Sequence, residues 1–165
     1  MKKFILFLFL IPNILNAGSI KAIGEKGKIS EVSRVIQINM YDNYYEPDKI
    51  EVKKGETIKF FIKNLGELVH EFNIATKIMH LEHQPEMMTL VENEIILSDK
   101  IDKQKMIEMV KKNPSMSHTH SNSVLLSPGE SGNLIWKFTN SVKLEAACNV
   151  PGHYEAGMIA EINNL

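Results

Sequence analysis

Cys148-Asn-Val-Pro-Gly-His153-Tyr-Glu-Ala-Gly-Met158 is the stretch of this 165-residue sequence that reveals most about its fold. It contains the only cysteine of the chain, followed at equal intervals by a histidine and a methionine. A thiolate, an imidazole and a thioether are ligands typical of copper electron-transfer sites. We therefore expect a copper site where a strand ends at Cys148 and the following loop carries His153 and Met158.

Such a site needs one more imidazole, and His70 is the candidate. It follows a strand-like run 78 residues before Cys148, so only a folded sheet can bring the two together. The expected arrangement is two imidazoles and a thiolate in a near-trigonal plane, with a weak thioether above it. Two alternatives stay open. Met158 can be a core methionine, with copper three-coordinate or bound axially by another group, and zinc can occupy a Cys-His-His set.

Short strand patterns separated by turn residues run through most of the chain. Lys54-Gly55-Glu56 and Pro128-Gly129-Glu130 are two of these turns. Short strands at this spacing indicate an all-β fold, specifically a β-sandwich. The strands are expected near residues 32–40, 50–52, 57–63, 68–74, 134–138, 144–148 and 158–162.

Residues 76–123 have a different character, being rich in Met, Glu, Lys and His and nearly free of glycine. Apolar residues near helical spacing predict one helix between Ile78 and Val91. A second short helix is expected, with Asp99 as its N-cap and Asn113-Pro114 at its end. We interpret this segment as a short helical insertion on the sandwich and not as a separate domain.

The insertion also carries soft and imidazole ligands that can bind additional copper. Three of them share one face of the first helix, namely Met79, His83 and Met87. The best candidates for a second copper site are Met116, His118 and His120, which alternate along an extended segment. The alternatives are that the helical methionines belong to the core and that the His-Thr-His stretch is a polar loop.

The N-terminus has the layout of a secretory signal peptide, residues 1–17. Lys2 and Lys3 precede an apolar run from Phe4 to Ile11, and Ala17-Gly18 is the expected cleavage point. The run is too short for a membrane-spanning helix, which needs about 20 apolar residues. A buried N-terminal helix or strand is the alternative. We expect export to a bacterial periplasm, no membrane insertion after cleavage, and a flexible arm over residues 18–30.

Charge and cysteine content narrow the function further. Two of the 19 basic residues lie in the signal peptide, which leaves 17 basic and 20 acidic residues and a net charge of about −3. This balance argues against nucleic acid or anionic lipid as a partner. A single cysteine excludes an internal disulfide. Exposed thiols oxidise outside the cytoplasm, so metal binding is one reason to keep Cys148, and burial as an inert side chain is the other.

Together these motifs resemble the cupredoxins, which are small copper proteins. The matching blocks are Tyr45-Glu-Pro-Asp-Lys-Ile-Glu-Val, Lys54-Gly-Glu-Thr-Ile-Lys-Phe, Asn64-Leu-Gly-Glu-Leu-Val-His70-Glu-Phe and the stretch from Cys148 to Met158. The resemblance implies a Greek-key β-sandwich over residues 31–165, interrupted by the insertion 76–123. It also implies one type 1 copper, held by His70, Cys148, His153 and Met158.

More narrowly, the chain is similar to periplasmic cupredoxin-like copper-tolerance proteins, which also carry a Met- and His-containing insertion. Many electron-carrier cupredoxins have Asn or Ser after the first ligand histidine, whereas this chain has Glu71. Whether the site is blue or greener therefore stays open.

Two functions follow from the sequence. The first is copper tolerance or handling, by binding or redox cycling of copper, and the alternative is a one-electron carrier of a respiratory chain. The Met and His residues of the insertion favour the first. We do not expect an enzyme, because multicopper enzymes need further His-rich sites and more than one such domain. The expected partners are copper ions and a periplasmic redox or copper-transfer protein.

Overall fold

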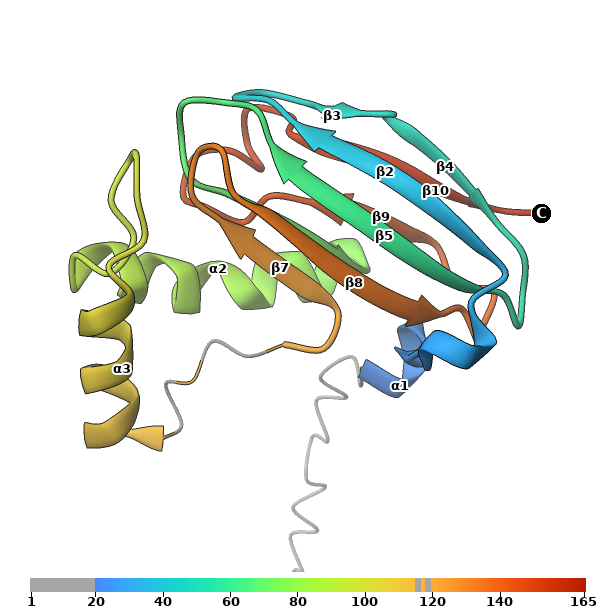
Figure 1. Ribbon diagram of the computed structural model, residues 1–165, viewed down its shortest axis with the longest axis horizontal. Coiled ribbons are helices and arrows are strands. Elements are labelled where there is room, and N and C mark those ends of the chain that lie inside the picture. The colour runs from blue at the N-terminus through green and yellow to red at the C-terminus, as the bar shows by residue number, and fades with distance from the viewer. Residues whose placement is uncertain (1–19, 115–116, 118–119) are drawn as a thin grey trace, which may run out of the picture.

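The computed structural model describes residues 20–114, 117 and 120–165, which form two five-stranded sheets packed face to face (Figure 1). The first sheet has the order β1-β8-β5-β2-β3. Its strands are β1 (Glu25–Lys26), β8 (Ser131–Lys137), β5 (Thr57–Asn64), β2 (Arg34–Met40) and β3 (Tyr45–Glu46). The second sheet has the order β4-β10-β9-β6-β7. Its strands are β4 (Lys49–Val52), β10 (Ile159–Asn164), β9 (Leu144–Ala147), β6 (His70–Ala75) and β7 (Ser123–Leu126).

Both sheets are mixed. β2 pairs in parallel with β5, and β4 pairs in parallel with β10, while the other strand pairs of the described residues are antiparallel. The chain passes from one sheet to the other between β5 and β6, which brings the two halves of the sequence into one core. This architecture confirms the expected all-β sandwich with a short helical insertion.

The core lies between the sheets and is rich in aromatic side chains. Side chains alternate between the two faces of a strand, so on β5 Phe60 points inward and Phe61 points outward. Phe60 is fully buried, with its ring 5.5 Å from that of Phe72 on β6 and 6.4 Å from that of Phe138. The Phe60–Phe72 contact joins the two sheets directly.

The insertion contains two helices, α2 (Lys77–Glu92) and α3 (Lys103–Lys112). Thr76 caps α2 by accepting a hydrogen bond from the backbone N–H of Met79 at 3.3 Å. The cap of α3 is Asp102 and not Asp99 as expected, because the Asp102 carboxylate accepts from the N–H of Lys105 at 2.9 Å. The last residue of α3 is Lys112 and its C-cap is Asn113, which agrees with the predicted end at Asn113-Pro114.

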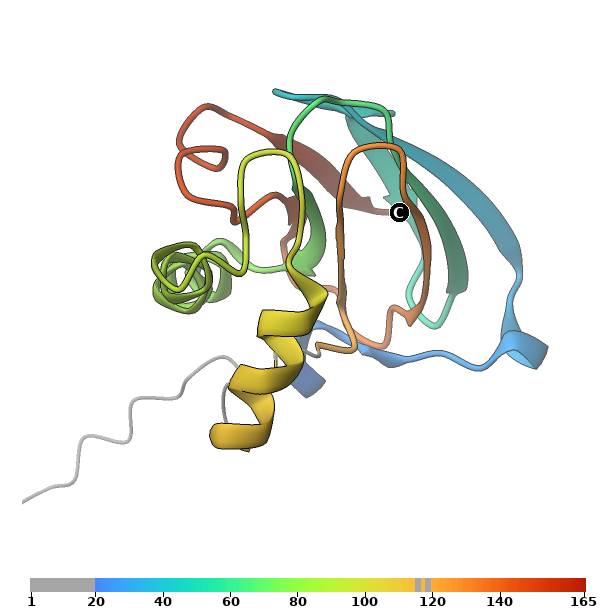
Figure 2. The ribbon, with the colours of Figure 1, turned by 60° about the vertical axis from the view of Figure 1, so that its left-hand side comes forward.

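Helix α2 covers the outer face of the second sheet, whereas α3 projects away from both sheets (Figures 1 and 2). His80 fastens α2 to this sheet through Oδ1 of Asn149 at 3.1 Å and the backbone carbonyl of Glu145 at 3.4 Å. Met87 and Leu90 of α2 are buried in the core cluster. Because α2 covers the outer face of β6, all six residues of β6 are buried, including the outward-facing Glu71 and Asn73.

Residues 20–30 do not form the loose arm that the sequence predicts. They contain α1 (Ile20–Ile23), β1 and the start of a 3-10 turn, η1 (Ile29–Glu31). Ile23 is fully buried, and its carbonyl accepts a hydrogen bond from Nε1 of Trp136 at 3.3 Å. The arm is therefore packed against β8, both by the pairing of β1 with β8 and by the acceptor that Ile23 offers to the buried indole N–H.

The expected signal peptide, residues 1–17, lies outside the described residues. Within the described part of the chain, no helix has both the length and the apolar character needed to cross a membrane.

The Phe60–Phe72 contact gives a stability prediction with an internal control. Phe60→Ala removes a fully buried ring and is expected to lower the free energy of unfolding by about 3–5 kcal/mol. Phe61→Ala, on the opposite face where Phe61 is 38% exposed, is expected to cost much less. Urea unfolding of the two variants measures the difference. Equal losses would contradict the assignment of the core face.

Candidate metal centre

The pairing of β6 with β9 brings His70 and Cys148 to the same end of the sandwich. In this antiparallel pair, Asn73 lies opposite Ala147. Glu71 lies two residues before Asn73, and Cys148 lies one residue after Ala147, so the two residues are neighbours across the strands. The backbone N–H of Glu71 donates to Sγ of Cys148 at 3.3 Å. His70, the first residue of β6, then lies at the mouth of the loop that follows β9.

The loop from Cys148 to Met158 returns on itself between β9 and β10. The N–H of Cys148 donates to the carbonyl of Met158 at 3.2 Å, and the N–H of Met158 donates to the carbonyl of His153 at 3.0 Å. Gly152 and Gly157 both have φ of +89°, a conformation that side chains disfavour. These bonds and turns hold His153 over Cys148.

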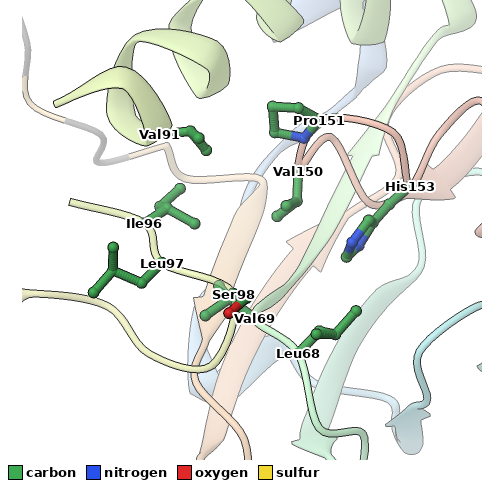
Figure 3. A pocket seen from close by; sticks show the side chains of 9 residues that line it. All are labelled: Leu68, Val69, Val91, Ile96, Leu97, Ser98, Val150, Pro151 and His153. Atoms are coloured by element: carbon green, nitrogen blue, oxygen red, sulfur yellow. The ribbon is translucent and has the colours of Figure 1, made fainter. Parts of the chain in front are cut away.

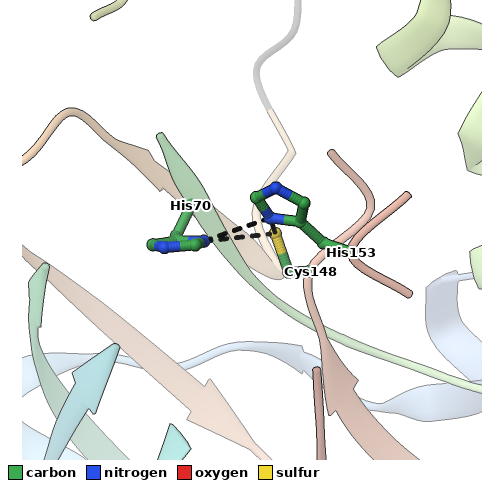
Figure 4. Close-up of side chains that lie close together, drawn as sticks. All are labelled: His70, Cys148 and His153. Carbon is green, nitrogen blue, oxygen red and sulfur yellow. Dashed lines mark hydrogen bonds between the residues drawn. The ribbon is translucent and has the colours of Figure 1, made fainter. Parts of the chain in front are cut away.

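Three donor atoms converge as a result (Figure 4). Nδ1 of His70 lies 3.2 Å from Nδ1 of His153, and Sγ of Cys148 lies 3.9 Å and 3.4 Å from these two nitrogens. Metal bonds of about 2.0–2.3 Å in a trigonal plane would separate such donors by about 3.5–3.8 Å. The triangle therefore matches a transition metal bound by two imidazoles and one thiolate.

Asp42 orients the His70 ring, and no sequence motif pointed to this residue. Its Oδ1 accepts from Nε2 of His70 at 3.0 Å and from the backbone N–H groups of Glu67 and Leu68. A carboxylate has no proton to give, so Nε2 carries the hydrogen and the Nδ1 lone pair faces Cys148. A Cβ on Gly66 would collide with Oδ1 of Asp42, so a larger residue there would displace the carboxylate that contacts His70.

Burial sets the protonation of the metal-free centre. Burial raises the pKa of the fully buried Cys148 thiol to about 12, although the N–H of Glu71 opposes this shift. Burial also lowers the pKa of His70, against the hydrogen bond and charge of Asp42, and it lowers the pKa of His153. At neutral pH the centre is therefore a thiol with two neutral imidazoles, and a cation must displace the thiol proton to gain a thiolate ligand.

Met158 is fully buried, and its backbone is bonded to Cys148 and His153 as described above. Phe72 and Val150 are buried as well. His153 is the exception, being only half-buried. It borders an apolar cavity of about 240 Å³ (Figure 3), lined mainly by Leu68, Val69, Val91, Ile96, Val150 and Pro151.

Glu71, the residue after His70, is fully buried. Its Oε2 accepts from Nδ2 of Asn149 at 2.8 Å, and its Oε1 accepts from Nδ2 of Asn73 at 3.2 Å. Oε1 also lies 3.3 Å from Nε2 of His83 on α2. Glu71 therefore ties the Cys148 loop to the helical insertion.

The residues expected to bind further copper are only partly described. Met116 and His118 lie outside the described residues. His120 lies beside His83 and Glu86 of α2, a grouping that the sequence did not suggest because Glu86 carried no motif. Met87 is buried in the core and Met79 packs against it, so these two methionines are structural side chains.

Comparison with known proteins identifies the family. The model of the cupredoxin-like domain matches residues 8–103, more than half of the chain. The chain belongs to the cupredoxin-like family. This match includes His70 and ends before Cys148.

Two relatives and one solved structure match a larger share of this cupredoxin than the family model does. The chain is 38% identical to the copper-resistant cuproprotein CopI of Pseudomonas aeruginosa, over 86% of this chain and 82% of the relative. It is 29% identical to a protein of the same name from Rubrivivax gelatinosus, over 84% and 71% of the two chains. Auracyanin from Roseiflexus castenholzii shares the fold, with a TM-score of 0.57 and 18% identity over 81% of this chain and 98% of that chain.

The electrostatics of the histidines give a pH prediction for the metal-free cupredoxin. We expect the imidazole pKa of His70 and His153 to lie below the ordinary value of 6.5, because burial disfavours their charged forms. Burial acts in the same direction on His83, but Glu71 and Glu86 outweigh it and raise its pKa to about 9. Proton NMR titration of the ring signals measures all three. A His70 pKa above 6.5 would mean that Asp42, and not burial, dominates.

Proposed function

We propose that this cupredoxin binds one copper ion in a type 1 site and serves copper tolerance in the bacterial periplasm. His70, Cys148 and His153 are the proposed ligands in the plane, with Met158 as the weak axial ligand. The triangle of donor atoms carries the proposal. The similarity to two copper-resistant cuproproteins supports the role in tolerance.

The surroundings of the ligands suit this task. Copper held in such a site can exchange one electron between Cu(I) and Cu(II). The N–H of Glu71 stabilises the Cys148 thiolate, and Asp42 keeps the His70 ring in one orientation. Burial of His70, Cys148 and Met158 keeps water from the centre. The site would therefore keep copper away from other molecules. It would also limit the change in copper geometry between Cu(I) and Cu(II).

One observation favours the second candidate, a one-electron carrier. The half-buried His153 borders an apolar cavity, and an exposed apolar patch beside the proposed copper site is suited to contact with a partner protein. Copper tolerance and electron carriage would use the same copper ligands. The two functions are therefore separated by the defect of a cell that lacks the protein. We propose a binding and redox role and no enzymatic reaction for this chain.

Copper titration tests the site itself. The wild-type protein with Cu(II) is expected to show an intense visible charge-transfer band from the Cys148 thiolate, and Cys148→Ser is expected to abolish it. A wild-type protein that stays colourless and binds no copper would contradict the proposal.

The role of Asp42 gives a graded prediction. Asp42→Ala removes the acceptor of the His70 N–H and is expected to weaken copper binding about 10–100-fold, the usual effect of losing such a partner. Asp42→Asn keeps an acceptor oxygen and is expected to lose less. Asp48→Ala, at an exposed position, is the control. Competition with a chromophoric Cu(I) chelator measures the affinities, and equal values for Asp42→Ala and the control would refute the role.

A deletion strain separates tolerance from electron carriage. We expect the strain to be sensitive to high copper and to respire normally in low copper. The wild-type gene is expected to restore growth in copper, and a gene encoding Cys148→Ser is expected to fail. Normal copper resistance together with impaired respiration would favour the electron carrier instead.

A further inference from the structure

A second group of metal-binding side chains lies on the insertion, apart from the Cys148 centre. His83 and Glu86 are one turn apart on α2, and His120 comes from the segment before β7. Nδ1 of His83 is 3.1 Å from Oε2 of Glu86, and Nε2 of His120 is 3.1 Å and 3.2 Å from the two oxygens of Glu86. One donor atom from each residue falls within 4.8 Å of the others.

The helix holds two of these side chains in a fixed place. Met87 and Leu90 anchor α2 in the core, and His80 fastens it to Asn149 and Glu145. His83 therefore cannot move far from Glu71, whose buried carboxylate lies 3.3 Å from Nε2 of His83. With Nε2 directed at this carboxylate, Nδ1 is directed at Glu86.

This arrangement repeats the one found at the first centre. There, Asp42 accepts from Nε2 of His70 and leaves Nδ1 for the metal. A carboxylate behind a histidine is the usual way in which proteins orient a metal-binding imidazole and increase its basicity. The carboxylate of Glu71 lies against Nε2 of His83, just as the carboxylate of Asp42 lies against Nε2 of His70. A chance ion pair on a helix surface would not require such a buried carboxylate behind the histidine.

We propose that His83, Glu86 and His120 form a second metal site, which binds Cu(II) through two imidazoles and one carboxylate. These donors are nitrogen and oxygen without sulfur, a set that suits Cu(II) better than Cu(I). Among the common divalent ions, Cu(II) binds such sets most tightly. The side chains of His83, Glu86 and His120 are 10%, 31% and 33% exposed, so an ion can reach the site from solvent.

The two centres then differ in chemistry but share Glu71. The first is buried and offers a thiolate, whereas the second is open and offers harder ligands. The backbone N–H of Glu71 contacts Sγ of Cys148, and its side chain orients His83. The chain would thus hold copper in two environments on either side of one residue of β6.

Copper stoichiometry with matched variants tests this proposal. The full chain is dialysed against excess Cu(II), passed through gel filtration, and measured for copper per chain and for the visible band of Cys148. The wild type is expected to retain two copper ions, and Glu86→Gln is expected to retain one with the band unchanged. His120→Asn is expected to match Glu86→Gln, which guards against a folding defect in α2. Glu82→Gln, an exposed charge on the same helix, is the control and is expected to retain two.

The outcomes distinguish this site from the first one. A wild type with one copper, or a Glu86→Gln protein with two, would overturn the second site. A protein without the visible band that still loses one copper through Glu86→Gln would support the second site and refute the type 1 centre.

Discussion

The pairing of β6 with β9 is the constraint on which the rest of the structure depends. Its register places the N–H of Glu71 against Sγ of Cys148 and puts His70 at the mouth of the loop that carries His153. A shift of one residue would turn Glu71 into the core and Phe72 out of it. The Phe60–Phe72 contact between the sheets opposes such a shift, so packing of the core and assembly of the metal centre are secured together.

The pairing of β2 with β5 determines the orientation of the His70 ring. These strands are parallel, with Met40 beside Asn64. Two residues beyond each strand, Asp42 therefore lies beside Gly66, close enough to reach Nε2 of His70. Asn64 fixes the connection to β6 by donating to the carbonyls of Leu68 and Leu126. The first sheet thus orients a candidate ligand that belongs to the second sheet.

The local sequence pattern was sufficient to predict the β-sandwich and to locate the candidate ligands along the chain. Cys148, His153 and Met158 share one loop, and strand alternation predicted most of the strands. Asp42 and Glu86 were missed because each acts on a residue distant in sequence, and their positions follow from strand register and helix packing. Residues 20–30 look like a loose arm because they are rich in glycine and lysine, while the burial of Ile23 depends on Trp136, more than a hundred residues away.

Glu71 links the candidate metal centre to the helical insertion. It fills an outward-facing position of β6 that only α2 makes buried, and its carboxylate is matched by Asn73, Asn149 and His83. The insertion is therefore part of the surroundings of the metal centre and not an appendage to the sandwich. The proposed copper centre, coupled in this way to a second proposed group of ligands, would suit a protein that handles copper.

X-ray absorption at the copper edge, on protein loaded with one equivalent of copper, tests the central claim most directly. The account predicts one short copper–sulfur bond and two copper–nitrogen bonds, with the short sulfur bond absent in Cys148→Ser. A first shell of only nitrogen and oxygen in the wild type would contradict it.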